Sequence, residues 1–166
     1  MLVSSKIKSK NNIIYLFYFL LAGLVISIIH YFFSSGFIYS FNSLGEIPYA
    51  PSPGLVLWLT FGFLIVISIA NYFILNLSNG FNHAGTKLSL CLFYVYMLGV
   101  LLWSFFSFTL SLPVAGLIML GLTICLGLYT CYRYLTRSIV GGVILTIFEL
   151  YLMLVFSSQL AYLLLK

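Results

Sequence analysis

Charged residues are scarce in this chain. Only 5% of its 166 residues are Asp, Glu, Lys or Arg, and 63% are hydrophobic. An ordinary soluble domain carries about a quarter charged residues. So few charged residues cannot form the surface of a globule of this size in water. The composition therefore excludes a soluble domain. It predicts an integral membrane protein with one domain that covers residues 1–166.

Acidic residues are almost absent, because Glu46 and Glu149 are the only two. This shortage excludes a carboxylate-rich hydrolytic or metal site. His30, His83 and the cysteines form no cluster with metal-ligand spacing, and no C-x-x-C pair occurs. We therefore predict no catalytic residues, no metal and no required cofactor. We also expect small, buried, hydrophobic thiols at Cys91, Cys125 and Cys131.

Long apolar runs dominate the sequence. A helix that spans a bilayer needs about 20 apolar residues, and five runs reach this length. They are continuously apolar, whereas strands of a membrane barrel alternate. The sequence predicts an all-α bundle of five transmembrane helices, with a long loop over 34–53. The predicted helices cover residues 13–33, 54–76, 88–109, 112–132 and 139–165.

Basic residues indicate the orientation of the bundle. With five spans, the three regions that contain them share one side, and the positive-inside rule makes that side cytoplasmic. We therefore predict a cytoplasmic N-terminus and an external 34–53 loop. Without a recognisable targeting peptide, we expect a bacterial plasma membrane, and the dispersed charges argue against nucleic-acid binding. The basic residues of these three regions are Lys6, Lys8, Lys10, Lys87, Arg133 and Arg137, and the opposite side holds only Lys166.

Glu149 interrupts the fifth apolar run, where a charge is costly. An ionisable residue at such a place is a candidate functional group. Helical spacing puts Phe156, Ser157 and Leu160 on its face, and we expect this face to point into the bundle. The structural alternative is a protonated carboxyl bonded to a neighbouring hydroxyl.

Aromatic residues make up 19% of the chain. Trp103 and Ser107 share a face of the third predicted helix, and Trp58 and Phe61 share a face of the second. Such stripes often serve packing alone. Aromatic faces that point inward from several helices would also suit a flat apolar ligand.

Three prolines, Pro48, Pro51 and Pro53, stand immediately before the second apolar run. Proline fixes φ and pushes the preceding residue out of the helical region. Pro53 also suits the first turn of a helix, where its missing N–H costs little. The segment therefore predicts a rigid elbow that leads into a membrane helix.

These features together resemble the TspO/MBR family, the tryptophan-rich sensory proteins and translocator proteins, which are five-helix membrane proteins of this length. The family's first loop ends in K-P-x-W-x-P-P, and IPYAPSP at 47–53 occupies that place. Its third helix carries N-x-x-W-(S/P)-x-x-F-F, to which VLLWSFFSF at 100–108 is similar. Its fifth-helix pattern, P-Y-x-x-W-x-x-F-x-x-x-x-N, aligns with 149–161 and retains Phe156.

The chain departs from these family patterns at several positions. Ala50 and Met153 stand where the family has tryptophans, and Val100 and Ala161 stand where it has asparagines. Glu149 replaces the proline of the fifth-helix pattern. The chain therefore resembles a divergent member of the TspO/MBR family.

The resemblance implies a pocket, covered by the first loop, for porphyrins, haem-like tetrapyrroles or sterols. It also implies a homodimer, since members often form dimers. Porphyrin breakdown, linked to some members, is less expected here because two tryptophans are missing. We expect a receptor, sensor or transport protein without enzymatic activity. The candidate ligand-binding residues are Tyr49, Ala50, Leu57, Phe61, Trp103, Leu110, Glu149, Phe156, Ser157 and Leu160.

Two other functions stay open at this point. A component of a small-solute transporter would need polar groups that continue through the bundle. A partner-binding or assembly membrane protein would instead turn its aromatic stripes toward other proteins.

Overall fold

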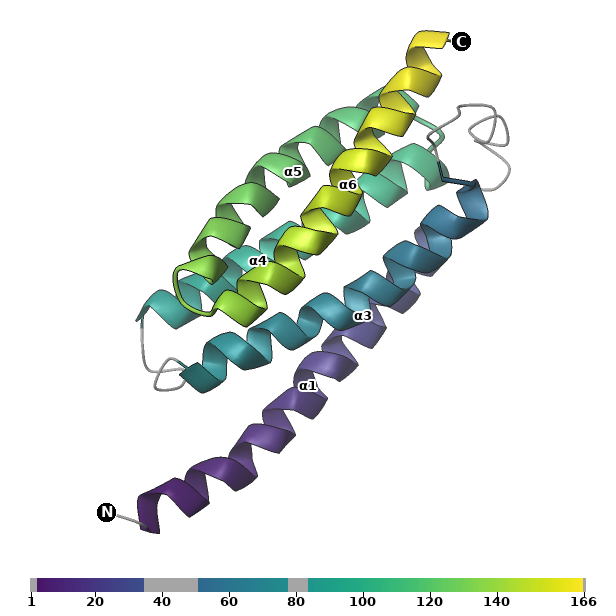
Figure 1. Cartoon of the computed structure of the whole chain (residues 1–166). Coiled ribbons are helices and arrows are strands. Elements are labelled where there is room, and N and C mark those ends of the chain that lie inside the picture. The colour runs from purple at the N-terminus through teal and green to yellow at the C-terminus, as the bar shows by residue number, and fades with distance from the viewer. Residues whose placement is uncertain (1–2, 35–50, 78–83, 166) are drawn as a thin grey trace.

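Every secondary-structure element among the described residues is a helix. The computed structural model describes residues 3–34, 51–77 and 84–165 (Figure 1). Five stretches are long and apolar enough to cross a membrane, with η2 continuing α4. The predicted all-α bundle of five transmembrane helices is confirmed. The elements are α1 Val3–Ser34, α3 Pro53–Leu77, α4 Ala84–Ser104, η2 Phe105–Thr109, α5 Pro113–Leu135 and α6 Ile139–Leu165.

The first helix is longer than predicted. It begins at Val3, whereas the apolar run begins at residue 13. An apolar run marks the part of a helix that crosses the bilayer, and it does not mark the helix end. Lysine is a good helix former, so the polar segment before the run continues the same helix.

The predicted elbow is seen where it enters α3, which begins at Pro53 as expected. Ser52 caps this helix, because its Oγ accepts a hydrogen bond from the Leu55 N–H at 3.4 Å. Its carbonyl accepts another from the Val56 N–H at 3.0 Å. Pro48 lies outside the described residues, so the rest of the elbow stays a prediction.

The helices pack in a ring. α1 packs mainly on α3, α3 on α6, α6 on α5, and α5 on α4, while α4 and η2 close the ring against α1. Figure 1 shows α1, in purple, beside α3 and away from most of α5 and α6. α1 is therefore the least enclosed helix of the bundle.

The two ends of the bundle differ in their connections (Figure 1). We call the end at which α1 and η2 end and α3 and α5 begin the loop end. We call the opposite end, at which α3 and α5 end and α4 and α6 begin, the basic end. The predicted grouping of basic regions on one side agrees with this arrangement.

The α4–α5 connection is as short as predicted, and the two helices are neighbours. Ser111 allows the reversal by taking a φ of 55°. The N–H groups of Leu110 and Leu112 donate to the carbonyls of Phe105 and Phe106 at 3.0 and 2.9 Å. These bonds satisfy carbonyls at the helix end, which would otherwise have no partner in lipid.

Small residues let α1 and α3 approach closely. A Cβ on Gly23 would lie 2.4 Å from the Ser68 Oγ, so only glycine fits there. Ser27 donates to the carbonyls of Gly23 at 2.8 Å and Phe61 at 3.0 Å, which links the two helices. This packing is typical of membrane helix interfaces.

The prediction that all three cysteines are buried is only partly correct. Cys131 is buried, but Cys91 and Cys125 are exposed on the outside of the bundle. A surface that faces lipid is as apolar as the interior, so a small apolar side chain is stable on either face.

Candidate functional site

Trp103 is the centre of a buried cluster near the loop end. Its indole is 0% exposed, and its Nε1 donates to the Oε1 of Gln159 on α6 at 3.2 Å. The ring centroid lies 6.2 Å from that of His30 on α1 and 5.5 Å from that of Phe108 on η2. Helices that are distant in sequence therefore meet around one indole.

Three buried polar atoms on the helices that meet here have no hydrogen-bond partner among the described residues. They are the Nδ1 of His30, the Oγ of Ser107 and the Nε2 of Gln159, and their residues are at most 3% exposed. The other ring nitrogen of His30, Nε2, lies 3.3 Å from the Ser34 Oγ. Because buried polar atoms are normally paired, these three atoms could bind a polar group of a ligand or a water molecule. We call His30, Trp103, Ser107 and Gln159 the indole cluster.

A π-helical segment sets the position of Ser107 in the indole cluster. Residues Phe105–Thr109 form η2, in which Ser107 and Phe108 are both buried. Gly116 allows α5 to approach, since a Cβ there would lie 1.9 Å from the Ser107 Oγ. π-Helical turns occur frequently at functional sites. The π-helical segment was not predicted from the sequence, because an apolar segment of the same composition can form either an α or a π turn.

The candidate residues of α3 and η2 do not all join the indole cluster. Leu57 is buried, and Phe61 is half-buried with its ring 6.0 Å from that of the exposed Trp58. Leu110 is exposed at the helix end. Tyr49 and Ala50, the candidates in the first loop, lie outside the described residues.

The predicted inward face of α6 is only partly inward. Glu149 is buried and Phe156 is half-buried, but Ser157 and Leu160 are exposed. The reason is that the buried stripe of α6 runs along another set of positions, so Glu149 lies at its edge. The stripe consists of Leu145, Phe148, Leu152, Val155 and Gln159. Phe156 meets α5, where a Cβ on Gly121 would lie 3.4 Å from its ring.

Glu149 forms a second buried polar site, near the middle of the bundle. The hydroxyl of Tyr96 on α4 donates to its Oε2 at 2.5 Å. The other oxygen, Oε1, has no hydrogen-bond partner among the described residues. Gly127 of α5 packs against both groups, because a Cβ there would lie 2.1 Å from Oε2 and 2.6 Å from the Tyr96 ring. The structural alternative predicted for Glu149 was a carboxyl bonded to a neighbouring hydroxyl. The hydrogen bond from Tyr96 confirms this contact.

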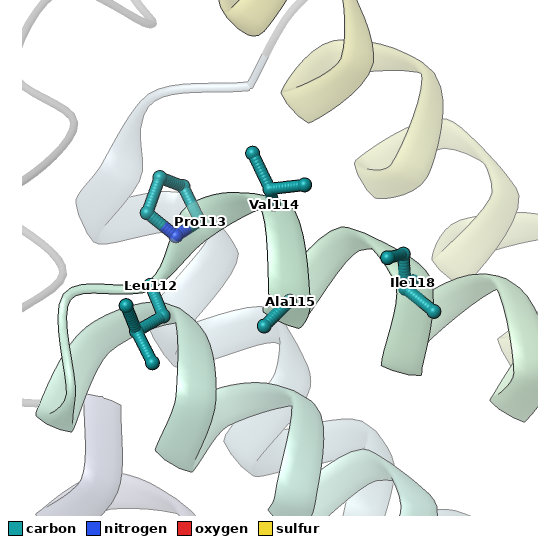
Figure 2. Close-up of a pocket in the computed structure, with 5 residues that line it drawn as sticks. All are labelled: Leu112, Pro113, Val114, Ala115 and Ile118. Atoms are coloured by element: carbon teal, nitrogen blue, oxygen red, sulfur yellow. The ribbon is translucent and has the colours of Figure 1, made fainter.

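Two hollows on the described surface are unrelated to either buried site. Figure 2 shows one of them, on the first turns of α5 beside the α4–α5 turn. Its lining is apolar, and it consists of Leu112, Pro113, Val114, Ala115 and Ile118. The other is on α1, lined by Ile14, Phe17, Tyr18 and Leu21. Neither hollow includes a predicted site residue, and lipid chains suit both.

Gln159, Tyr96 and His30 are not among the site residues predicted from the sequence. A signal existed for Gln159, because it is a strongly polar residue within an apolar helix, as Glu149 is. His30 has the same signal in α1. Tyr96 carries none, since tyrosine is frequent throughout this chain and only the fold reveals its partner.

The fold and these sites define an integral membrane protein with several membrane-spanning helices and with polar groups enclosed inside the bundle. Comparisons with models of protein families, with curated proteins and with solved structures give no match for this chain.

Proposed function

We propose that this membrane protein binds a hydrophobic planar ligand at the loop end and acts as a receptor, sensor or transport protein. The ligand class is a porphyrin or another tetrapyrrole, or a sterol. The proposal keeps the resemblance to the TspO/MBR family stated above, as a divergent member. It also keeps the expected homodimer, cytoplasmic N-terminus and bacterial plasma membrane.

The observation that supports this proposal is the indole cluster. Ligand sites are mostly apolar, with a few polar groups that fix the orientation of the ligand. Trp103 supplies a large aromatic surface, while His30, Ser107 and Gln159 each hold a buried polar atom without a partner among the described residues. A tetrapyrrole or a sterol has the complementary form, a flat apolar body with carboxylate or hydroxyl groups at its edge.

Access to the cluster requires a change in packing, because Trp103 is fully buried. α1 contacts the rest of the bundle mainly through α3, and its membrane-spanning part is the least buried of the five spans among the described residues. His30 is the contribution of α1 to the cluster. Movement of α1 at the loop end would therefore uncover the Trp103 indole and the unpaired Nδ1 of His30 together.

The test is a titration of the full chain in lipid nanodiscs with protoporphyrin IX. Binding is read from tryptophan quenching and, independently, from the shift of the porphyrin absorption band. We expect saturation, and about tenfold weaker binding for Trp103→Phe, the loss of roughly one well-placed contact. The matched control is Trp58→Phe, since Trp58 is 62% exposed and outside the cluster.

Two outcomes would count against the proposal. One is the absence of saturation with every tetrapyrrole and sterol tested. The other is an equal loss of affinity in Trp103→Phe and Trp58→Phe, which would locate the ligand outside the indole cluster. A sterol that displaces protoporphyrin IX would indicate one shared site for both ligand classes.

A second candidate function is the transport of a small solute, because buried polar pairs occur at several levels of the bundle. Tyr151 lies 2.7 Å from Thr60, and Tyr134 donates to Asn71, in addition to the two sites above. The Nδ2 of Asn71 has no partner among the described residues. Flux of a small solute into liposomes that contain the protein would favour this function, and impermeable liposomes would exclude it.

A further inference from the structure

The Glu149 site is distinct from the proposed ligand site. Glu149 and Gln159 are ten residues apart on α6, about 15 Å along the helix axis. Glu149 is 1% exposed and Tyr96 is 0% exposed, so neither reaches the outer surface. The function proposed for the loop end makes no use of this carboxyl.

The surroundings of Glu149 do not suit a negative charge. One hydrogen bond, from the Tyr96 hydroxyl, reaches Oε2, and no described residue bonds to Oε1. The other titratable side chain beside it is Cys131 on α5, which supplies no positive charge. Tyr134, further along α5, is bonded to Asn71 instead. A buried carboxylate without a cation or further donors is very costly.

The packing around Oε2 of the carboxyl also leaves no room for hydration. Gly127 touches Oε2 and the Tyr96 ring so closely that even a methyl group would overlap both. Phe148, the residue before Glu149, packs its ring 6.1 Å from that of Tyr96. Water can therefore solvate an ionised Glu149 only if α5 separates from α4 and α6 near Gly127.

We propose that Glu149 is a proton-binding site in the middle of the bundle, and that release of its proton is coupled to the opening of the α5 contact at Gly127. In the packed form, Oε2 accepts from Tyr96 and the proton is on Oε1. In the open form, the carboxylate is hydrated and the proton has left to water. The protein is then a membrane helix bundle with a proton-linked packing equilibrium.

The first measurement tests whether the proton is bound. Glu46→Gln leaves Glu149 as the only acidic side chain, so its infrared carboxyl band can be assigned directly. We expect the C=O band of a protonated carboxyl at neutral pH in the Glu46→Gln protein, in lipid. Tyr96→Phe should move this band to higher frequency, because the carbonyl loses its donor. Absence of the band at neutral pH overturns the proposal.

The second measurement tests the coupling to opening. Cys91→Ser and Cys125→Ser leave buried Cys131, one turn from Gly127, as the only thiol. Its alkylation by a small water-soluble reagent needs both a thiolate and an open contact. At pH values below the titration of both groups, the alkylation rate should rise about a hundredfold per pH unit, because Glu149 and Cys131 each lose one proton. With Glu149→Gln added, the alkylation rate should rise only about tenfold per pH unit, because only the thiol loses a proton.

Equal pH dependence with and without Glu149→Gln overturns the coupling. If Glu149→Gln does not fold, Tyr96→Phe replaces it. That variant removes the hydrogen bond that holds the protonated carboxyl in the packed form, so the steep rise in alkylation should move to lower pH. An unmoved profile in Tyr96→Phe overturns the coupling as well. Loss of protoporphyrin binding in these variants is a separate result, because the two sites lie at different levels of α6.

Discussion

The two buried polar sites differ in how the helices enclose them. The indole cluster lies near the loop end and joins α1, α4, η2 and α6, and three of its polar atoms have no partner among the described residues. The Glu149 site lies near the middle and joins α4, α5 and α6, with one such atom. The indole cluster includes the least enclosed helix of the bundle, whereas the Glu149 site is closed by Gly127.

This difference in packing is the basis for the two roles proposed above for similar chemistry. We propose that the unpaired polar atoms beside the least enclosed helix bind a ligand. We propose that the carboxyl closed in by Gly127 exchanges a proton. The distinction depends on packing and not on which polar residues are present.

The largest expected effect concerns the indole itself. Trp103→Ala should lower the free energy of unfolding by about 3–5 kcal/mol, because it leaves a cavity and an unpaired Gln159 amide. Trp58→Ala should cost less than about 1 kcal/mol, since Trp58 is mostly exposed. Unfolding in mixed detergent micelles measures both values. Similar losses in the two variants would contradict the burial difference between these tryptophans.

The second prediction tests the seal at the Glu149 site. Gly127→Ala should destabilise the protein by about 1–3 kcal/mol, because the added methyl overlaps Oε2 and the Tyr96 ring. The matched control is Gly62→Ala, where a Cβ meets nothing within 4 Å. That change should be neutral or stabilise the helix by up to about 1 kcal/mol. If Gly127→Ala left the free energy of unfolding unchanged, the close contact of Gly127 with Glu149 and Tyr96 would be contradicted.

The third prediction compares binding and stability at the indole cluster. Gln159→Leu leaves the buried Trp103 Nε1–H without its acceptor, so the free energy of unfolding should fall by about 1–3 kcal/mol. Affinity for protoporphyrin IX should fall about tenfold, because a polar contact for the ligand is lost. Unchanged affinity would leave Gln159 with a purely structural role.

The smallest expected effect belongs to a polar pair that is fully satisfied. The Tyr151 hydroxyl lies 2.7 Å from the Thr60 Oγ1 and donates to the Val56 carbonyl at 2.9 Å. Tyr151→Phe should cost about 0.6 kcal/mol, the average for hydrogen bonds between membrane helices. Tyr132→Phe, on an exposed tyrosine, should cost nothing measurable. Ligand affinity should be unchanged in both variants.

The number of helices and their connections could be predicted from the sequence, because apolar length and turn residues act locally. The start of α3 at Pro53 and the short turn before Pro113 are examples. Which face of a helix points inward could not be predicted as well. In a bilayer both faces are apolar, so Ser157, Leu160 and Cys91 carried no clear signal of exposure.

The candidate site was predicted only in part for the same reason. Trp103 and Glu149 stand out as rare residues in apolar runs, and both are buried at polar contacts. Their partners, Gln159 and Tyr96, come from other helices and depend on the tertiary arrangement. The π turn that buries Ser107 depends on local backbone geometry, which composition does not encode.

The hydrogen bonds of Ser27 have a consequence for the biogenesis of this protein. Both of its acceptors belong to α1 and α3, two helices that follow one another along the chain. This hydroxyl is therefore satisfied as soon as the hairpin of α1 and α3 has formed in the membrane. His30, on the same helix, meets Trp103 only after α4 has been synthesised. Until then, α1 carries a polar ring in the membrane without its aromatic neighbour.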